Sequence, residues 1–419
     1  LIDAVLRRTG LKIDVFTVGD VVYYIDSYLS HKLAAHYPIH SKDLLIAEVG
    51  SGSLDVSVME KGFPLFNLGL PIGALRIKQL FSKLDGSLED NLEAVQENIE
   101  NEFSSLVRLV QDRKIDDVII VDENYSPYLS NLLPGRDPGS KFYKLNQNEI
   151  QKALTAVSRL NNEEISAKYK LPMEIAESIH TYLNILNNFF AFIKNKYLYV
   201  LETSLAEAVL GHLLLSSKLG TKYDRIGQHI AVAKYICEKY QGDPAHAQNV
   251  TDSAKALFDA LKEELGLRDE EYLYLMLASY LHDIGSFIHN RLHHKHTEYI
   301  ISSLSLFRLT EEEIRVIACI ARYHRRGTPS DTHPIYNSLS PNNKILVQKL
   351  SALLRIANAL DSAHRQKTRD LKVKLSANGS ISLTVKTHSN FLLEKNEFGK
   401  KKDMLEEITG KPISLIIKE

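Results

Sequence analysis

The sequence has few cysteines, which limits both the chemistry and the compartment of the protein. Only two occur among the 419 residues, Cys237 and Cys319, and each lies in an apolar stretch with helical spacing. Two such cysteines do not suggest a disulfide framework. We therefore expect a reducing compartment, the cytoplasm.

Long apolar runs are also absent from the sequence. No stretch approaches the roughly 20 apolar residues that a membrane-spanning helix requires, and no secretory signal peptide is visible at the start. Leu1 already lies inside a helical pattern that ends at Gly10, so we expect part of the protein to precede it. These features predict no membrane partner.

An excess of charge of either sign is missing too. The formal net charge is −1, from 51 basic and 52 acidic residues, so a basic groove for a polyanion must be sought locally. We expect no specific nucleic-acid partner. The contents of hydrophobic residues (44%) and charged residues (25%) are ordinary for a soluble globular protein. The length predicts roughly two to four domains, and no internal repeat is present.

Residues 11–135 alternate between predicted strands and helices. The run LLIAEVG at 44–50 is apolar except for Glu48, as in a strand that is buried on both faces. The next run, SLDVSVME at 53–60, alternates apolar and polar residues, which is typical of a strand. A stretch with two prolines and two glycines at 131–141 indicates a linker. We therefore predict an α/β domain over 1–145.

One long helix is predicted within this α/β domain. Residues 88–110 carry apolar side chains at helical spacing after a possible N-cap pair, Ser87 and Asp90.

Helical patterns dominate the rest of the chain. Beyond residue 145 the periodicity is almost entirely helical up to about residue 366, which predicts an all-α domain over 146–368. The segment DLKVKLSANGSISLTVKTH has a hairpin pattern, so a small α+β domain is expected over 369–419.

The first group of residues that could carry chemistry is Gly50-Ser51-Gly52-Ser53, between two predicted strands. Glycines allow a tight turn that brings backbone N–H groups close to phosphate oxygens, and serine hydroxyls add donors. Two flanking acids, Glu48 and Asp55, could hold Mg²⁺ or position a water molecule. The alternative is an ordinary hairpin turn without chemistry.

The second group is a set of possible metal ligands in the helical region. His246 begins one predicted helix, His282 and Asp283 end another, and Asp361 lies near the end of a third. Imidazole nitrogens and carboxylate oxygens suit a divalent metal ion, which can polarise a phosphoryl oxygen or activate water. The alternative is that these helix-terminal histidines only satisfy backbone carbonyls.

The third group is cationic. Histidine, lysine and arginine residues gather at 289–296, 322–326 and 355–369. If the helices bring them together, they form a groove for phosphates, to which arginine offers bidentate contacts. The alternative is a solvated basic face.

These residues resemble a known family. HDIG followed by HHKHTEYII, ARYHRR and LLRIANALDSAHRQ closely resembles the C-terminal helical domain of the exopolyphosphatase/guanosine pentaphosphate phosphohydrolase (Ppx/GppA) family. EVGSGSLDVSVM resembles its Asp-x-Gly-Gly-Gly-Ser-x-Glu loop, and LGLPIGALRI resembles its Leu-Pro-Leu-Gly-x-x-Arg segment. The resemblance covers essentially the whole chain. It implies the second lobe of an actin/sugar-kinase (ribonuclease H-like) module, an HD-type helical domain and a small C-terminal domain, with the first lobe missing before Leu1.

The resemblance also implies a function. Such an enzyme releases terminal phosphate from inorganic polyphosphate, or the 5′ phosphate from guanosine pentaphosphate, with Mg²⁺, and is often a homodimer. Guanosine tetraphosphate is a further expected ligand. Carried over by position, the roles fall on the following residues: Glu48 and Asp55 as catalytic acids; Gly50, Ser51, Gly52, Ser53 and Arg76 for phosphate; His294, Lys295, His296, Arg325 and Arg326 for the polyanion; and His246, His282, Asp283 and Asp361 for a possible divalent metal.

The front half departs from the family pattern at several positions. Ser51 replaces a glycine, and Glu48 and Asp55 exchange aspartate and glutamate relative to the family, which changes their reach by one methylene. Asp122-Glu123-Asn124 replaces a Gly-Gly-Thr turn. Two alternatives to a Ppx/GppA-type hydrolase therefore stay open. One is a catalytically eroded protein that binds polyphosphate or guanosine alarmones, and the other is an HD-domain metal phosphohydrolase.

Overall fold

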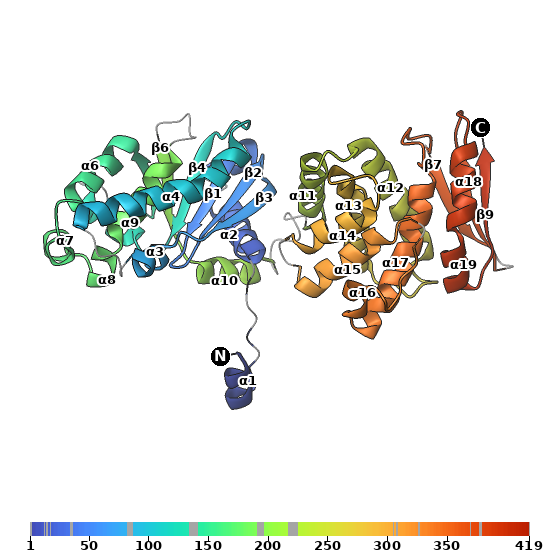
Figure 1. Ribbon diagram of the computed structural model, residues 1–419, viewed down its shortest axis with the longest axis horizontal. Coiled ribbons are helices and arrows are strands. Elements are labelled where there is room, and N and C mark those ends of the chain that lie inside the picture. Colours follow the sequence, from blue (N-terminus) through green and yellow to red (C-terminus); the bar gives the residue numbers. More distant parts are fainter. Residues whose placement is uncertain are drawn as a thin grey trace. The chain divides into compact units, whose positions relative to one another are not determined.

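The computed structural model describes residues 2–11, 13, 16, 18–33, 37–81, 87–133, 141–190, 197–216, 225–304, 306, 309–325, 327–368, 370–376 and 379–418. The chain divides into two compact units, Leu1–Tyr223 and Asp224–Glu419. The first unit is mixed α/β, and the second is mainly helical with a small sheet (Figure 1).

A six-stranded sheet forms the centre of the first unit, in the order β3-β2-β1-β4-β6-β5. The strands are β1 (Asp43–Val49), β2 (Leu54–Glu60), β3 (Phe63–Leu70), β4 (Asp117–Asp122), β5 (Phe142–Asn146) and β6 (Tyr197–Glu202). β1 pairs in parallel with β4, and β4 pairs in parallel with β6. The pairs β1 and β2, β2 and β3, and β5 and β6 are antiparallel.

Helices cover both faces of this sheet (Figure 1). On one face, Leu45 and Ala47 of β1 share a core with Ile99 and Phe103 of α4 (Leu88–Val110) and with α9 (Ile179–Phe189). On the other face, the alternate β1 residues Leu44 and Ile46 pack against α2 (Val18–Lys32) and α10 (Leu205–Ser216). β1 is therefore buried on both faces, as its apolar run predicts.

The remaining elements of this unit are short. They are α1 (Ile2–Thr9), η1 (Ile39–Ser41), α3 (Ala74–Phe81), η2 (Ser126–Tyr128), α5 (Leu129–Leu132), α6 (Gln147–Val157), α7 (Asn162–Tyr169) and α8 (Met173–Ala176). The N-cap prediction for α4 is confirmed. The Asp90 N–H donates to the Ser87 hydroxyl oxygen at 3.1 Å, and the Ser87 N–H donates to the Asp90 carboxylate at 3.1 Å.

The prediction of an almost entirely helical pattern between residue 145 and about residue 366 misses one strand, β6. Its sequence, YLYVLE, is a short apolar run that fits a buried helix as well as a strand by pattern. Tertiary pairing makes this segment a strand, because β6 pairs in parallel with β4 on one side and antiparallel with β5 on the other.

Helices build most of the second unit. They are α11 (Arg225–Lys239), α12 (Pro244–Leu261), η3 (Asp269–Glu271), α13 (Tyr272–Leu281), η4 (Ile284–Phe287), α14 (His293–Ser302), α15 (Glu311–Arg322), α16 (Pro334–Asn337) and α17 (Pro341–Ala359). α13 lies at the centre, because every residue from Leu275 to Leu281 is buried. A helix that is apolar on all sides is typical of a core position.

A small α+β part completes this unit. Its sheet has the order β7 (Asp370–Leu375), β8 (Ile381–Lys386), β9 (Ile413–Lys418), and α18 (Leu392–Lys401) and α19 (Asp403–Thr409) pack against α17. The predicted hairpin is present, and Gly379 lies in its turn with a φ of 81°. Asn378 lies outside the described residues. The predicted domain boundaries after 145 and 368 stay predictions.

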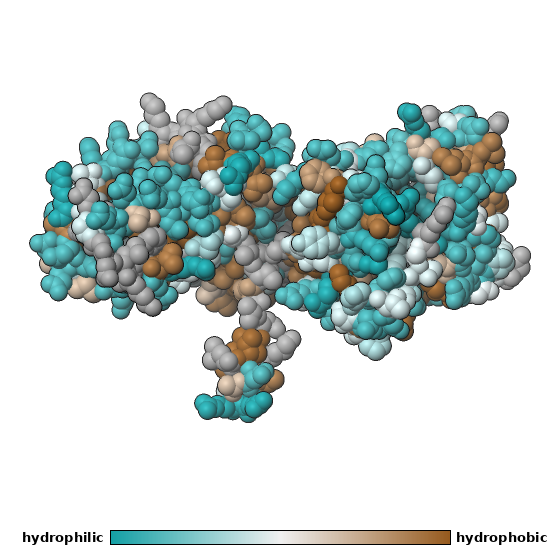
Figure 2. Space-filling view, viewed as in Figure 1, coloured by the Kyte–Doolittle hydropathy of each residue, from teal (hydrophilic) through white to brown (hydrophobic). Residues whose placement is uncertain are grey.

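The surface agrees with the ordinary composition. The viewed face of each unit is mostly hydrophilic, with apolar side chains scattered across it (Figure 2). In the part of the chain that the structure describes, no helix is both long and apolar enough to cross a membrane. Cys237 and Cys319 are buried and free.

Candidate functional site

The glycine-serine loop joins β1 to β2 and brings the two predicted catalytic acids together. Glu48 and Asp55 are direct partners in the antiparallel register of these strands. The Gly50 N–H donates to the Ser53 carbonyl at 2.9 Å and closes the turn. The hairpin thus places both carboxylates beside the loop that the sequence predicts to bind phosphate.

The loop is fixed against the start of α3. The Ser51 carbonyl accepts the backbone N–H groups of Leu75 at 3.1 Å and Arg76 at 3.2 Å. A Cβ on Gly73 would lie 2.3 Å from the Ser51 carbonyl carbon, so only glycine allows this approach. Arg76 is exposed at the first turn of α3.

Burial controls the ionisation of the two acids. Burial, and then the charges of Asp55, Asp122 and Glu123, raise the pKa of Glu48 to about 7. Burial also raises the pKa of Asp55, against the effect of a 3.3 Å hydrogen bond from Ser53. The other carboxylate oxygen of Asp55 is buried and has no hydrogen-bond partner among the described residues. Such a pair can hold a proton or a divalent cation.

The turn at Asp122-Glu123-Asn124 has a structural role. The buried Asp122 carboxylate accepts the backbone N–H groups of Asn124 (2.9 Å), Tyr125 (3.1 Å) and Ser126 (2.6 Å). It therefore satisfies the free donors at the start of η2.

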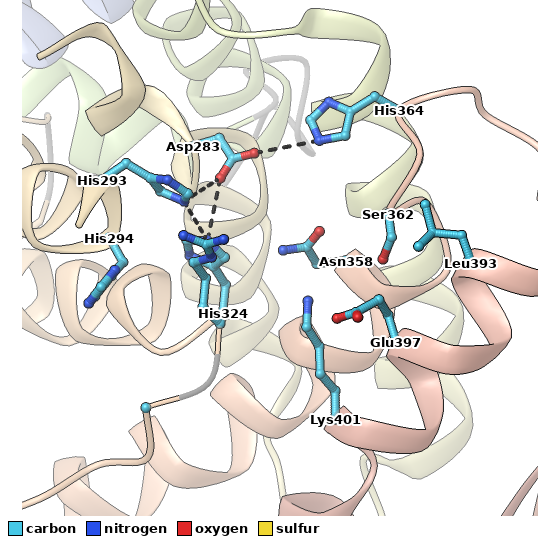
Figure 3. A pocket seen from close by; sticks show the side chains of 12 residues that line it. Asp283, His293, His294, His324, Asn358, Ser362, His364, Leu393, Glu397 and Lys401 are labelled. Atoms are coloured by element: carbon cyan, nitrogen blue, oxygen red, sulfur yellow. Dashed lines mark hydrogen bonds and ion pairs between the residues drawn. The ribbon is translucent and has the colours of Figure 1, made fainter. Parts of the chain in front are cut away.

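The second unit contains a cluster of imidazoles around one carboxylate, Asp283 (Figure 3). One oxygen, Oδ1, lies 3.2 Å from His293 Nε2 and 3.4 Å from His324 Nε2. The other, Oδ2, lies 3.4 Å from His282 Nε2 and 3.8 Å from His246 Nε2. Four imidazole nitrogens therefore converge on a single carboxylate.

Backbone carbonyls orient three of these rings in the same way. The Nδ1 atom of His282 lies 2.8 Å from the Ser279 carbonyl oxygen, and that of His324 lies 2.6 Å from the Ala321 carbonyl oxygen. His293 Nδ1 lies 3.1 Å from the carbonyl three residues before it. Because a carbonyl only accepts, Nδ1 is the donor in each contact, and the Nε2 atom of each ring faces the cluster.

Asp361 holds His246 from behind. Its Oδ2 lies 2.9 Å from His246 Nδ1, and its Oδ1 accepts the backbone N–H groups of Arg365 and Gln366 at 3.2 and 2.7 Å. His364 stacks on the His246 ring, with the ring centres 3.6 Å apart, and its Nε2 lies 3.9 Å from Asp283 Oδ2. The four predicted metal ligands thus lie together, and Asp361 contacts Nδ1 of His246 rather than the Nε2 atoms around Asp283.

The HDIG sequence places His293 through its glycine. The Gly285 N–H donates to the Thr297 hydroxyl at 3.0 Å, and that hydroxyl donates to the His282 carbonyl at 2.9 Å. A Cβ on Gly285 would lie 2.1 Å from the His293 carbonyl oxygen. Glycine therefore lets η4 lie directly against the first turn of α14, which carries His293.

The cluster has unequal pKa shifts. Burial lowers the pKa of His246 and holds that of His324 well below its ordinary value. Burial also disfavours charged His282, but the charge of Asp283 and hydrogen bonds outweigh it and raise the pKa of His282. Burial opposes ionisation of Asp283, yet the surrounding imidazoles hold the pKa of its carboxyl well below the usual range. Asp283 is therefore ionised, as a metal ligand must be.

A pocket of about 650 Å³ opens beside the cluster (Figure 3). Asp283, His293 and His324 lie at one end, and Asn358 and Ser362 lie at or just beyond the end of α17. One face of α18 forms the opposite wall through Leu393, Glu397 and Lys401. Burial lowers the pKa of Lys401 to about 8. The C-terminal part thus completes this pocket.

The predicted polyanion residues are divided by the structure. His294 and Arg325 line the pocket. Lys295, which is exposed, and His296, which is half-buried, do not line it. Arg326 lies outside the described residues. Buried Arg355 supports the loop after α15 by donating to the Arg325 and Gly327 carbonyls.

Three histidines of the cluster were predicted only as cationic residues. They are His293, His324 and His364. One signal was available in the sequence. His282 directly follows α13 and His324 lies two residues past the end of α15, and at such places a buried ring can donate to the carbonyl three residues before it. Lys401 and Glu397 gave no such signal, because they reach the site only through the packing of α18.

Two family models match the chain. The model of the Ppx/GppA phosphatase family matches residues 2–217, and the model of Ppx/GppA phosphatase domain III matches residues 230–406. Together they include both candidate sites.

Curated and solved proteins are similar over parts of the chain. Guanosine-5′-triphosphate,3′-diphosphate pyrophosphatases of Pseudoalteromonas translucida and Photobacterium profundum are each 30% identical, over 29% and 31% of this chain and 24% and 25% of their own length. The matched part thus spans about a quarter of these relatives.

Two solved structures also match. The Aquifex aeolicus Ppx/GppA protein matches at 19% identity and a TM-score of 0.44, over 52% of this chain and 69% of its own. An exopolyphosphatase from Cytophaga hutchinsonii matches at 15% identity and a TM-score of 0.44, over 52% of this chain and 71% of its own. Because the first family model covers more than half of the sequence, the chain belongs to the Ppx/GppA phosphatase family.

Proposed function

We propose that this protein is a metal-dependent phosphohydrolase whose chemistry is carried by the His/Asp cluster of the second unit. The observation that carries the proposal is the convergence of four imidazole Nε2 atoms on the Asp283 carboxylate at the end of a pocket. Family membership supports phosphate chemistry in general.

The donor set decides which metals fit. Imidazole nitrogens with a carboxylate suit Mn²⁺, Fe²⁺, Co²⁺ or Zn²⁺ better than Mg²⁺, which prefers oxygen ligands. A bound ion would supply Lewis-acid polarisation of a phosphoryl oxygen and a water of lowered pKa. His246, His282 and Asp283 would hold it, and Asp361 would keep the His246 ring oriented.

The chain's own residues would hold the substrate. Arg325 and Lys401 line the pocket and would balance phosphate charge, and Asn358 offers an amide donor. We propose inorganic polyphosphate or guanosine pentaphosphate as the substrate, with terminal or 5′ phosphate as the product. One solved and one curated relative carry names of this kind, exopolyphosphatase and guanosine-5′-triphosphate,3′-diphosphate pyrophosphatase.

The glycine-serine loop between β1 and β2 is a second candidate site. Glu48, with its raised pKa, and Asp55, with an unsatisfied buried oxygen, provide oxygen ligands that suit Mg²⁺. In this proposal the Gly50–Ser53 loop and Arg76 bind phosphate, and the first unit is a lobe of an actin/sugar-kinase type. The sheet order β3-β2-β1-β4-β6 supports that assignment.

Assembly and organisation are proposed along the same lines. We propose a cytoplasmic homodimer with the domains 1–145, 146–368 (HD-type) and 369–419. Light scattering of the purified protein tests the dimer, and a mass equal to one chain would contradict it.

The function is tested by phosphate release from long-chain polyphosphate and from guanosine pentaphosphate, with Mn²⁺ and separately with Mg²⁺. Turnover of either substrate that is faster with Mn²⁺ would support the proposal. Micromolar binding without turnover in either metal would instead favour the catalytically eroded binding protein, and neither binding nor turnover would contradict both.

A further inference from the structure

The four predicted metal ligands would hold one metal ion, but the cluster contains more donors than one ion needs. We infer that it is built for a pair of divalent ions, with the Asp283 carboxylate bridging the two positions. His246 and His282 belong to the first position, on Asp283 Oδ2. His293 and His324 belong to the second, on Oδ1. This inference deepens the proposed function and rests on it only for the identity of the substrate.

The second position has the dimensions of a metal site. Its three edges are 3.1 Å between His293 Nε2 and His324 Nε2, 3.2 Å from His293 Nε2 to Asp283 Oδ1, and 3.4 Å from His324 Nε2 to Oδ1. Donor atoms bound to one ion at about 2.1 Å lie about 3.0 Å apart at a right angle and about 3.4 Å apart at a tetrahedral angle. All three edges lie in this range.

The first position is slightly wider. His246 Nε2 and His282 Nε2 are 3.2 Å apart, and they lie 3.8 and 3.4 Å from Asp283 Oδ2. His364 Nε2 lies 3.9 Å from the same oxygen, so this position has a further imidazole within reach. Because the two positions use different oxygens of one carboxylate, they can be filled at the same time.

The orientation of the rings also favours a shared ion. Backbone carbonyls accept from Nδ1 of His282, His293 and His324, which turns their Nε2 atoms toward Asp283. The Nε2 atoms of His293 and His324 lie 3.1 Å apart, close enough to bind one ion. A proton shared between these two rings is the competing explanation, and it predicts no second metal.

The pocket fixes the ligand class for such a pair. Two-metal sites hold their ions about 3.5–4 Å apart, a separation that one phosphate group can bridge through two oxygens. Both positions open onto the pocket, because His293 and His324 of the second position and His364 beside the first line it. The pair would therefore take a phosphoryl group, with the remainder of the substrate toward Lys401 and Asn358.

The test is metal stoichiometry together with the magnetic coupling of bound Mn²⁺ in the purified protein. We expect about two ions per chain and an electron paramagnetic resonance spectrum of a coupled pair. His293→Gln should reduce the content to about one ion and abolish the coupling, since His293 serves only the second position. Glutamine keeps most of the side-chain volume, and His293 is partly exposed, so folding is preserved. His388→Gln, at an exposed histidine outside the cluster, is the matched control and should change neither value.

The outcomes separate this inference from the proposed function. One ion per chain that is unaffected by His293→Gln, or two ions without coupling, would overturn the paired site. The wild-type spectrum decides this even where a variant fails to fold. A coupled pair in a protein that hydrolyses neither phosphate substrate would instead overturn the proposed function and leave the paired site intact.

Discussion

Glu48 shows how neighbouring charges set the behaviour of one side chain. Its pKa is raised to about 7 by burial first and then by Asp55, Asp122 and Glu123. Near neutral pH this group is therefore divided between its protonated and ionised forms, and a cation at the pair would be bound more tightly as pH rises through 7.

Carbon-13 NMR of the Glu48 carboxyl measures this ionisation directly. We predict an apparent pKa of about 7. Asp55→Asn should lower it more than Glu123→Gln does, because Asp55 makes the larger charge contribution. Glu60→Gln, at the exposed far end of β2, should leave it unchanged. A pKa near the ordinary value for glutamate in the wild-type protein would contradict this account of the pair.

The docking of α2 on β2 depends on a buried acid. Asp26 is 1% exposed, and the Ser57 hydroxyl donates to its two carboxylate oxygens at 3.1 and 3.0 Å. Burial raises the pKa of Asp26 to about 8. Unfolding therefore releases a proton from this group between its ordinary pKa near 4 and a pH of about 8.

The sign of the resulting pH dependence follows. The contribution of Asp26 to stability is fully present below pH 4, falls as pH rises by up to about 1.4 kcal/mol per pH unit, and levels off above pH 8. We predict that Asp26→Asn, a neutral mimic, flattens this slope. Urea denaturation at several pH values between 4 and 8 measures it, and parallel slopes for both proteins would contradict the assignment.

The contact between the glycine-serine loop and α3 depends on Gly73. We predict that Gly73→Ala destabilises the first unit by about 1–3 kcal/mol, because the new methyl group must displace the Ser51 backbone. Gly52→Ala is the matched control on the same loop. A Cβ there meets nothing within 4 Å, so its stability should change little. Equal effects of the two changes in urea denaturation would show that the loop is not docked as described.

Single helices and strands were the part of the fold most accessible to sequence reasoning. The run from Leu88 to Val110 was predicted with its bounds and its Ser87 cap, because both signals are local. β6 was missed, because its short apolar run becomes a strand only by pairing with β4. Local pattern decides an element when it is long and periodic, and tertiary pairing decides it when it is short.

The candidate site shows the same division. The His-Asp pair at 282–283 was visible as a motif, but the convergence of His293 and His324 on Asp283 depends on the packing of α13, α14 and α15. The pocket wall from α18 lies more than a hundred residues along the chain from Asp283. Sequence spacing carries no information about such contacts.

For the molecule as a whole, metal binding should stabilise one unit selectively. Mn²⁺ at 100 times its dissociation constant would add about 2.7 kcal/mol to the folded state that binds it. We predict slower hydrogen exchange in α12 and α13 of the second unit on adding Mn²⁺, with no change in the sheet of the first unit. Asp283→Asn should abolish the effect. Equal protection of both units would contradict a site confined to the second.

The central claim is that hydrolysis takes place at Asp283 and its imidazoles. The most direct measurement is the rate of phosphate release from polyphosphate by Mn²⁺-loaded protein, compared with Asp283→Asn and Glu48→Gln under the same conditions. We predict that Asp283→Asn lowers the rate at least about a hundredfold, as expected for loss of a metal-bridging ligand, and that Glu48→Gln retains most of it. Full activity in Asp283→Asn, together with a hundredfold loss in Glu48→Gln, would contradict the claim. It would place the chemistry at the glycine-serine loop between β1 and β2.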